Sequence, residues 1–151
     1  MAKPIPDGYP RVMPYLYIDG ANAAIDFYTS ILGATERMIM PGPEGKVGHA
    51  ELTIGDSVIM LADEFPDMGA RGPKAVGGSP VTIHVYVEDV DATFDRAISA
   101  GAKALRPVED KFYGDRGGEF EDPFGHRWSI ATHVEDVSPE EMQERMSQMP
   151  G

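Results

Sequence analysis

The stretch YLYIDGANAAID, residues 15–26, aligns without gaps on HVYVEDVDATFD, residues 84–95. Identical residues occupy three aligned positions: Tyr17/Tyr86, Ala23/Ala92 and Asp26/Asp95. In each copy the apolar residues first alternate with a period of two, which is typical of a half-buried strand, and then follow the spacing of an amphipathic helix. A Gly-Ala pair follows both copies, at residues 33–34 and 101–102, where glycine can end a helix. The chain therefore contains two copies of one β-α unit.

Three short strands are predicted after each helix. They lie around residues 36–40, 49–54 and 58–62, and around residues 103–108, 118–121 and 127–132. The order β-α-β-β-β, found twice, predicts an α+β fold in which two modules form a cupped mixed sheet around a shared ligand cavity. We expect one domain over residues 1–151, since this length is typical of a single domain.

The modules of this domain are placed at residues 11–62 and 80–134. Residues 63–79 are rich in glycine and proline and have little periodicity, so they are predicted to form a linker that could also close as a lid. Residues 138–149 are predicted to form a C-terminal helical tail, with Ser138 as its N-cap and Pro139 at its first position.

The composition limits the possible partners. The chain has 25 acidic and 13 basic residues and a formal net charge of -12, which disfavours nucleic acid and anionic lipid, so we expect neither a nucleic-acid nor a membrane partner. It has no cysteine, which excludes disulfides, thiolate nucleophiles and cysteine-based metal sites. No apolar segment has the length of a signal sequence or of a bilayer span, so we expect a cytoplasmic protein.

Further motifs lie outside the aligned stretch. They are PYLYIDG at residues 14–20, AAIDFY at 23–28, FYGDR at 112–116 and DPFGHRW at 122–128. With these motifs and the duplicated element order, the chain resembles the vicinal oxygen chelate superfamily of glyoxalase I, bleomycin-resistance proteins and extradiol dioxygenases, and its PhnB-like branch most closely. The resemblance implies the glyoxalase/bleomycin-resistance fold and a homodimer.

Enzymes of that superfamily hold a divalent metal with a His or Glu from the first strand of each module and a carboxylate from the last strand. The matching positions here are Tyr15, Met60 (or its neighbour Ile59), His84 and Ser129. Only His84 is a usual ligand, because a thioether and a neutral hydroxyl suit a hard cation poorly. We therefore expect no metal cofactor and favour a binding protein over an enzyme.

A displaced polar site is the alternative. Strand alternation puts His49 and Glu51 on one face of the first module, and Glu119 and Glu121 on one face of the second. A cluster of His49, Glu51, His84 and Glu121 could bind a divalent metal or act as general acid and base. The other interpretation is that these groups face solvent or hydrogen-bond one another.

Tyr113 and Arg116 lie in a run that is too polar for a core. Arg116 could bind an anionic ligand through two hydrogen bonds, or it could pair with Asp115 or another loop acid. Trp128, the only tryptophan, is expected to be a core anchor behind the last strand.

The preferred function is that of a metal-independent protein of the bleomycin-resistance type, which binds a small, partly aromatic molecule in the cavity between the modules. The expected lining residues are Tyr15, Tyr17, Met60, His84, Tyr86, Tyr113 and Arg116. One alternative is a metal-dependent lyase, isomerase or dioxygenase centred on His84 with Glu51 or Glu121. Another is a scaffold protein whose cup is filled by side chains or by a partner subunit.

Overall fold

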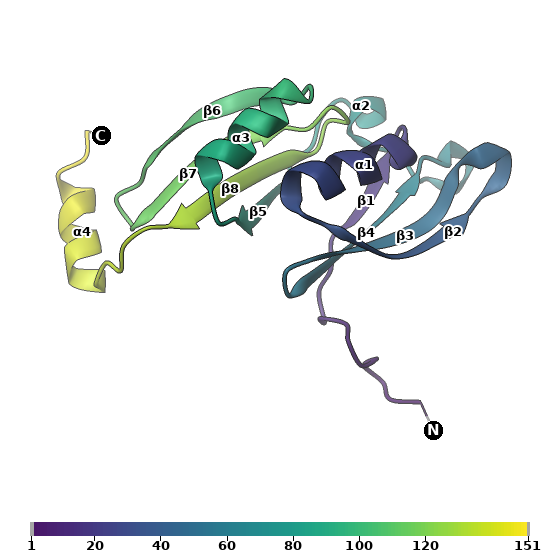
Figure 1. Ribbon diagram of the computed structural model, residues 1–151, viewed down its shortest axis with the longest axis horizontal. Helices are drawn as coiled ribbons and strands as arrows, with labels where there is room; N and C mark the ends of the chain where they lie inside the picture. The colour runs from purple at the N-terminus through teal and green to yellow at the C-terminus, as the bar shows by residue number, and fades with distance from the viewer. Residues whose placement is uncertain (1, 151) are drawn as a thin grey trace. The chain divides into compact units, whose positions relative to one another are not determined.

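A computed structural model of the chain describes residues 2–150, and the chain divides into two compact units after Ser79 (Figure 1). The first unit contains β1 (Tyr15–Ile18), α1 (Ala21–Leu32), β2 (Thr35–Pro41), β3 (Val47–Ile54) and β4 (Ser57–Asp63). The second contains β5 (Thr82–Tyr86), α3 (Val90–Ser99), β6 (Lys103–Asp110), β7 (Asp115–Glu121) and β8 (Arg127–His133). The predicted order β-α-β-β-β is confirmed in both units.

Each unit has its own four-stranded mixed sheet, and the two sheets share one topology. The strand orders are β1-β4-β3-β2 and β5-β8-β7-β6, with the first strand parallel to the last and the other pairs antiparallel. The predicted α+β class is therefore confirmed, in the form of two sheets. The predicted start of β7 at Gly118 is wrong, because Asp115 and Arg116 already pair with His133 and Thr132 of β8.

The core of the first unit lies between α1 and one face of its sheet. The apolar residues of α1 recur every three or four positions, so the side chains of Ala24, Tyr28 and Ile31 fall on one buried stripe. They pack on the aliphatic sheet face, where Leu52 and Leu61 are fully buried. Burying a large aliphatic or aromatic side chain contributes about 1.5–3 kcal/mol, so this interface is the main source of the unit's stability.

The core of the second unit is centred on Trp128, as predicted. Its side chain is fully buried, and its indole Nε1 donates to Asp122 Oδ2 at 2.9 Å. Asp122 Oδ1 also accepts from the backbone N–H groups of Phe124 and His126 at 2.9 and 3.0 Å. One buried carboxylate thus fixes both the 122–126 turn and the indole.

Equivalent positions of the two last strands hold the start of the helix in each unit. In the first unit, Asp63 Oδ1 accepts from the N–H of Ala21 at 2.9 Å and Oδ2 from the N–H of Val47 at 2.7 Å. In the second, Thr132 Oγ1 accepts from the N–H of Val90 at 3.0 Å. Asp63 lies three residues after Met60, the partner of Tyr15, and Thr132 lies three residues after Ser129, the partner of His84. The duplication has kept the position while the residue has changed.

Four short elements complete the described part of the chain, of which only the first lies within a repeat. They are η1 (Pro43–Gly45), η2 (Pro66–Met68), α2 (Pro73–Val76) and α4 (Pro139–Ser147). The segment predicted as a linker, residues 63–79, contains η2 and α2. Helix α4 begins after Ser138, whose Oγ accepts from the N–H of Glu141 at 3.1 Å. Within residues 2–150, no helix combines the length and apolar character needed to span a membrane.

Candidate functional site

The four positions that correspond to metal ligands in the superfamily pair within each unit. Tyr15 lies opposite Met60 across β1 and β4, and His84 lies opposite Ser129 across β5 and β8. The register favours Met60 over Ile59, since Ile59 precedes Met60 in the strand, is 3% exposed and belongs to the core face.

These residues do not fit a hard divalent cation. They offer a phenol, a thioether, an imidazole and a hydroxyl, and the His84 Nδ1 is already within 2.9 Å of Ser129 Oγ. Over the described residues 2–150, no three His, Asp or Glu side chains are grouped so that they could hold a metal ion.

In the first unit, the sheet face opposite α1 carries a buried carboxylate. Glu51 on β3 is 4% exposed, although it does not belong to the apolar core. Its Oε1 accepts from Tyr9 Oη at 2.7 Å and lies 3.5 Å from Arg37 Nε, while its Oε2 lies 2.9 Å from His49 Nε2. These contacts compensate the cost of burying the charge. The hydrogen bond from His49 and that from Tyr9 hold the pKa of Glu51 below its usual value, although burial opposes this shift.

The hydrogen bonds continue from Glu51 through His49 to Tyr15. His49 Nδ1 lies 2.8 Å from Tyr15 Oη. Because the carboxylate of Glu51 can only accept, Nε2 of the neutral imidazole carries the proton and Nδ1 accepts from the tyrosine. Burial, Tyr17 and Glu51 raise the pKa of the Tyr15 hydroxyl, so Tyr15 is the protonated end of the chain. Tyr15 is 41% exposed and gives this network an open end.

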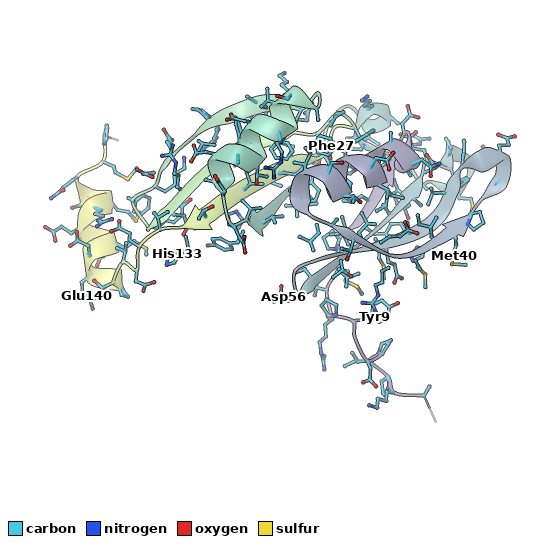
Figure 2. The ribbon with its side chains drawn as sticks, viewed as in Figure 1. Tyr9, Phe27, Met40, Asp56, His133 and Glu140 are labelled. Carbon is cyan, nitrogen blue, oxygen red and sulfur yellow. The ribbon has the colours of Figure 1, made fainter. Side chains whose placement is uncertain are left out.

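The N-terminal segment, residues 2–13, meets this face of the first unit through Tyr9. Figure 2 shows Tyr9 on the opposite side of the sheet from Phe27 of α1. Tyr9 is held by its bond to Glu51 and by the guanidinium of Arg37, which lies 4.2 Å from the centre of its ring.

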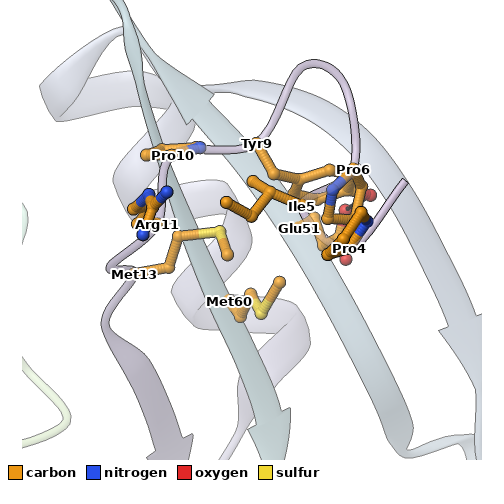
Figure 3. Close-up of a pocket in the computed structure, with 9 residues that line it drawn as sticks. All are labelled: Pro4, Ile5, Pro6, Tyr9, Pro10, Arg11, Met13, Glu51 and Met60. Atoms are coloured by element: carbon orange, nitrogen blue, oxygen red, sulfur yellow. Dashed lines mark hydrogen bonds between the residues drawn. The ribbon is translucent and has the colours of Figure 1, made fainter.

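Between this segment and the sheet lies a cavity of about 560 Å³ (Figure 3). Its lining is mostly apolar, with two charged side chains: Pro4, Ile5, Pro6, Tyr9, Pro10, Arg11, Met13, Glu51 and Met60. This volume and this lining fall in the range of sites for small organic ligands, and the cavity is open to solvent on one side.

The sheet face of the second unit carries a second, different network. Tyr86 Oη donates to Asp115 Oδ2 at 2.8 Å, and His133 Nδ1 lies 2.8 Å from Asp115 Oδ1. Asp115 is 4% exposed. His133 Nε2 also lies 2.8 Å from Asp136 Oδ1. The hydrogen bonds to Asp136 and, to a smaller extent, to Asp115 raise the pKa of the His133 imidazole. The His84 ring packs edge-on against Tyr86, with ring centres 4.9 Å apart.

The other predicted residues of the second unit are placed apart from that network or at its edge. Arg116 binds both carboxylate oxygens of Asp91 on α3, at 2.8 and 3.0 Å, and Asp110 at 3.2 Å. The structure thus shows the ion-pair alternative, with Asp91 and Asp110 in place of Asp115. Glu121 is half-buried and pairs with Arg127 of β8. The residue of β7 that pairs with Ser129 is Glu119, two positions earlier. Tyr113 is 39% exposed.

Sequence reasoning found His49, Glu51, Tyr15 and Met60 but not their partners. Tyr9 and Arg11 precede the aligned stretch that begins at Tyr15, and no periodicity marks a role for them. Arg37 lies on the edge strand β2 at a register shift between Glu36 and Met38, so simple alternation does not predict its direction. The contacts of Tyr9 with Glu51 and Arg37, together with the cavity lining, show that the N-terminal segment belongs to the site.

Known proteins match this chain over most of its length. A family model of the Glyoxalase/Bleomycin resistance protein/Dioxygenase superfamily matches residues 9–130. Uncharacterized protein Mb0911c of Mycobacterium bovis is 46% identical over 141 residues, which cover 91% of this chain and 93% of that protein.

Two solved structures share the fold. Protein PA1353 from Pseudomonas aeruginosa has a TM-score of 0.65 at 26% identity and covers 83% of this chain and 99% of its own. A PhnB protein from Bacillus cereus has a TM-score of 0.62 at 20% identity and covers 82% of this chain and 99% of its own. The family model covers most of the chain and decides the classification: the chain belongs to the glyoxalase/bleomycin resistance protein/dioxygenase superfamily.

Proposed function

We propose that this protein binds a small, partly aromatic molecule on the sheet face of its first unit and needs no catalytic metal to do so. The observation that carries the proposal is the cavity of about 560 Å³ between the N-terminal segment and the sheet. Of the ligand-binding residues expected from the sequence, Met60 lines this cavity, and Tyr15 lies opposite Met60 on β1.

The chemistry of the walls favours a flat, largely apolar ligand. Met13 and Met60 are flexible and polarizable, so they can adapt to an aromatic surface. Tyr9 offers a ring held in place by Glu51 and Arg37, which limits the entropy lost on binding. The charged groups Arg11 and Glu51 can orient a polar substituent. The homodimer expected from the resemblance stays a prediction and is not needed for this site.

Calorimetric titration with 7-methoxycoumarin and 1,4-naphthoquinone, two planar probes, tests the proposal. Protein treated with a chelator should bind at least one of them with the same affinity as untreated protein. Met60→Trp should weaken binding at least about tenfold, because the larger side chain fills part of the cavity. Met68→Trp is the matched control, since Met68 is 84% exposed and lies outside the cavity lining.

Three results would contradict the proposal. They are the absence of binding by both probes, an equal loss of binding in the Met60 and Met68 variants, and binding that disappears with the chelator and returns with a divalent ion. The last result would favour the metal-dependent alternative.

A further inference from the structure

The connected side chains Tyr15, His49 and Glu51 form a hydrogen-bonded chain beside the cavity. We infer that they are a proton relay, and that the ligand is a planar phenol or enol which loses its hydroxyl proton to the relay on binding. This inference rests on the proposed function and names the ligand class of the same site.

The transfer balances within the protein and the ligand. The hydroxyl of the ligand approaches Tyr15 Oη, and its proton passes to that oxygen. The O–H bond of Tyr15 breaks at the same time, and the tyrosine proton passes over 2.8 Å to His49 Nδ1. The products are a ligand anion, a neutral Tyr15 and a His49 imidazolium whose Nε2 faces the Glu51 carboxylate at 2.9 Å. No further reactant is required.

Burial of Glu51 supports the relay. A tyrosine–histidine contact on an open sheet face needs no carboxylate, and burying a charged group lowers stability unless it is well paired. Glu51 is 4% exposed, and Tyr9, Arg37 and His49 surround its two oxygens. A carboxylate fixed in this way stabilises the imidazolium electrostatically without moving.

Glu51 and Tyr15, the two ends of the relay, lie on either side of Met60 in the sheet. Glu51 and Met60 pair across β3 and β4, and Met60 and Tyr15 pair across β4 and β1, so the three side chains share one row of the sheet. Glu51 and Met60 line the cavity, and Tyr15 is 41% exposed beside them. The inference requires the ligand to extend from the cavity past Met60 to the exposed hydroxyl of Tyr15, which lies outside the cavity lining.

The cavity also holds a group that suits an anion. Arg11 lines the cavity, and among residues 2–150 no carboxylate forms an ion pair with it. The guanidinium favours the ionised form of a phenol and offsets the Glu51 carboxylate in the same lining, whose charge opposes it.

Absorption titration with 7-hydroxycoumarin tests the inference, because the neutral and ionised forms of this phenol absorb at different wavelengths. At a pH where the free probe is neutral, the bound probe should absorb as the anion. It should also bind at least about tenfold more tightly than 7-methoxycoumarin, which has no proton to lose. In Tyr15→Phe and in His49→Gln, the bound probe should be neutral and the ratio of the two affinities should fall to about one.

The control variant is His126→Gln, which changes a histidine in the other unit and should leave the wild-type spectrum and ratio unchanged. If 7-methoxycoumarin binds but bound 7-hydroxycoumarin stays neutral, the relay is overturned and the proposed binding function stands. An affinity ratio that survives in Tyr15→Phe also overturns the relay. If 1,4-naphthoquinone binds and neither coumarin does, the relay is overturned and the proposed function stands. If none of the three probes binds, the proposed function fails together with the inference.

Discussion

Asp122 is the single residue whose loss should be felt most in the second unit. It is 3% exposed and accepts from Phe124, His126 and the indole of Trp128. Asp122→Ala removes the acceptor of three hydrogen bonds, one of them from the fully buried indole, so we expect the free energy of unfolding to fall by about 3 kcal/mol. Urea denaturation followed by the fluorescence of Trp128, the only tryptophan, measures this directly. A loss below about 1 kcal/mol, equal to that in the exposed-turn variant Asp56→Ala, would contradict the assignment.

Glu51 should make the stability of the protein depend on acid pH. Its folded-state pKa lies below the ordinary value of 4.5, chiefly because of the hydrogen bond to His49. The carboxylate therefore stabilises the fold above that value, and the contribution disappears as the pH falls through the lowered pKa.

The measurement is the difference in unfolding free energy between wild type and Glu51→Gln, followed from about pH 7 to about pH 3. We expect the wild type to lose its advantage on the acid side, because Glu51 becomes protonated there. The other carboxylates titrate in both proteins, so their effect cancels in the difference. A difference that is constant over the whole range, or that grows toward acid, would show that the charge of Glu51 is not favoured in the folded state.

At the scale of elements, Asp63 joins the end of β4 to the start of both α1 and β3. Asp63→Ala removes the acceptor for the N–H groups of Gly20, Ala21 and Val47. Loss of a capping side chain costs about 1–2 kcal/mol, and the bond to Val47 adds about 1 kcal/mol, so we expect a loss of about 2–3 kcal/mol.

Amide hydrogen exchange places the effect of this substitution. Exchange should accelerate at Ala21 and Val47 in Asp63→Ala, and the second unit should keep its protection at Val90, which is capped by Thr132. Uniform acceleration in both units would instead mean that Asp63 acts only through global stability.

The elements themselves could be predicted from the sequence because each has its own periodic pattern. Ala24, Tyr28 and Ile31 recur at helical spacing, and this spacing correctly predicted α1. Leu16 and Ile18 alternate with tyrosines, and this alternation correctly predicted β1. The start of β7 was misplaced because Asp115 and Arg116 have low strand propensity. Pairing with β8 and the contacts to His133 and Asp91 outweigh that propensity.

The candidate site could be predicted only where it depends on strand alternation. Alternation correctly grouped His49 with Glu51 and Tyr15 with Tyr17. It could not show that Tyr9 folds back onto Glu51, because residues 2–13 have no regular structure and their position depends on a contact 42 residues away in sequence. Long-range contacts of irregular segments leave no periodic signal.

At the scale of the whole molecule, net charge lowers the stability of the folded chain, while local ion pairs raise it. Most of the ion pairs are exposed, such as Lys3–Asp7 and Arg116–Asp110, and each contributes at most about 1 kcal/mol. The excess of 25 acidic over 13 basic residues repels itself throughout the folded chain. Salt weakens both effects, but the repulsion acts over longer distances and is screened first.

We therefore expect the melting temperature to rise by a few degrees as sodium chloride increases from about 0.01 M to about 0.3 M, because the Debye length falls from about 30 Å to below 10 Å. Repulsion grows with the square of the net charge. The double variant Glu88→Gln, Glu144→Gln, which changes two exposed side chains, lowers the formal charge from -12 to -10 and should reduce the rise by about a third. Scanning calorimetry of both proteins over the salt series measures the slope of melting temperature against salt for each.

A melting temperature that falls with salt would mean that the ion pairs, taken together, outweigh the repulsion. An unchanged slope in the double variant would mean that the salt effect does not arise from net charge.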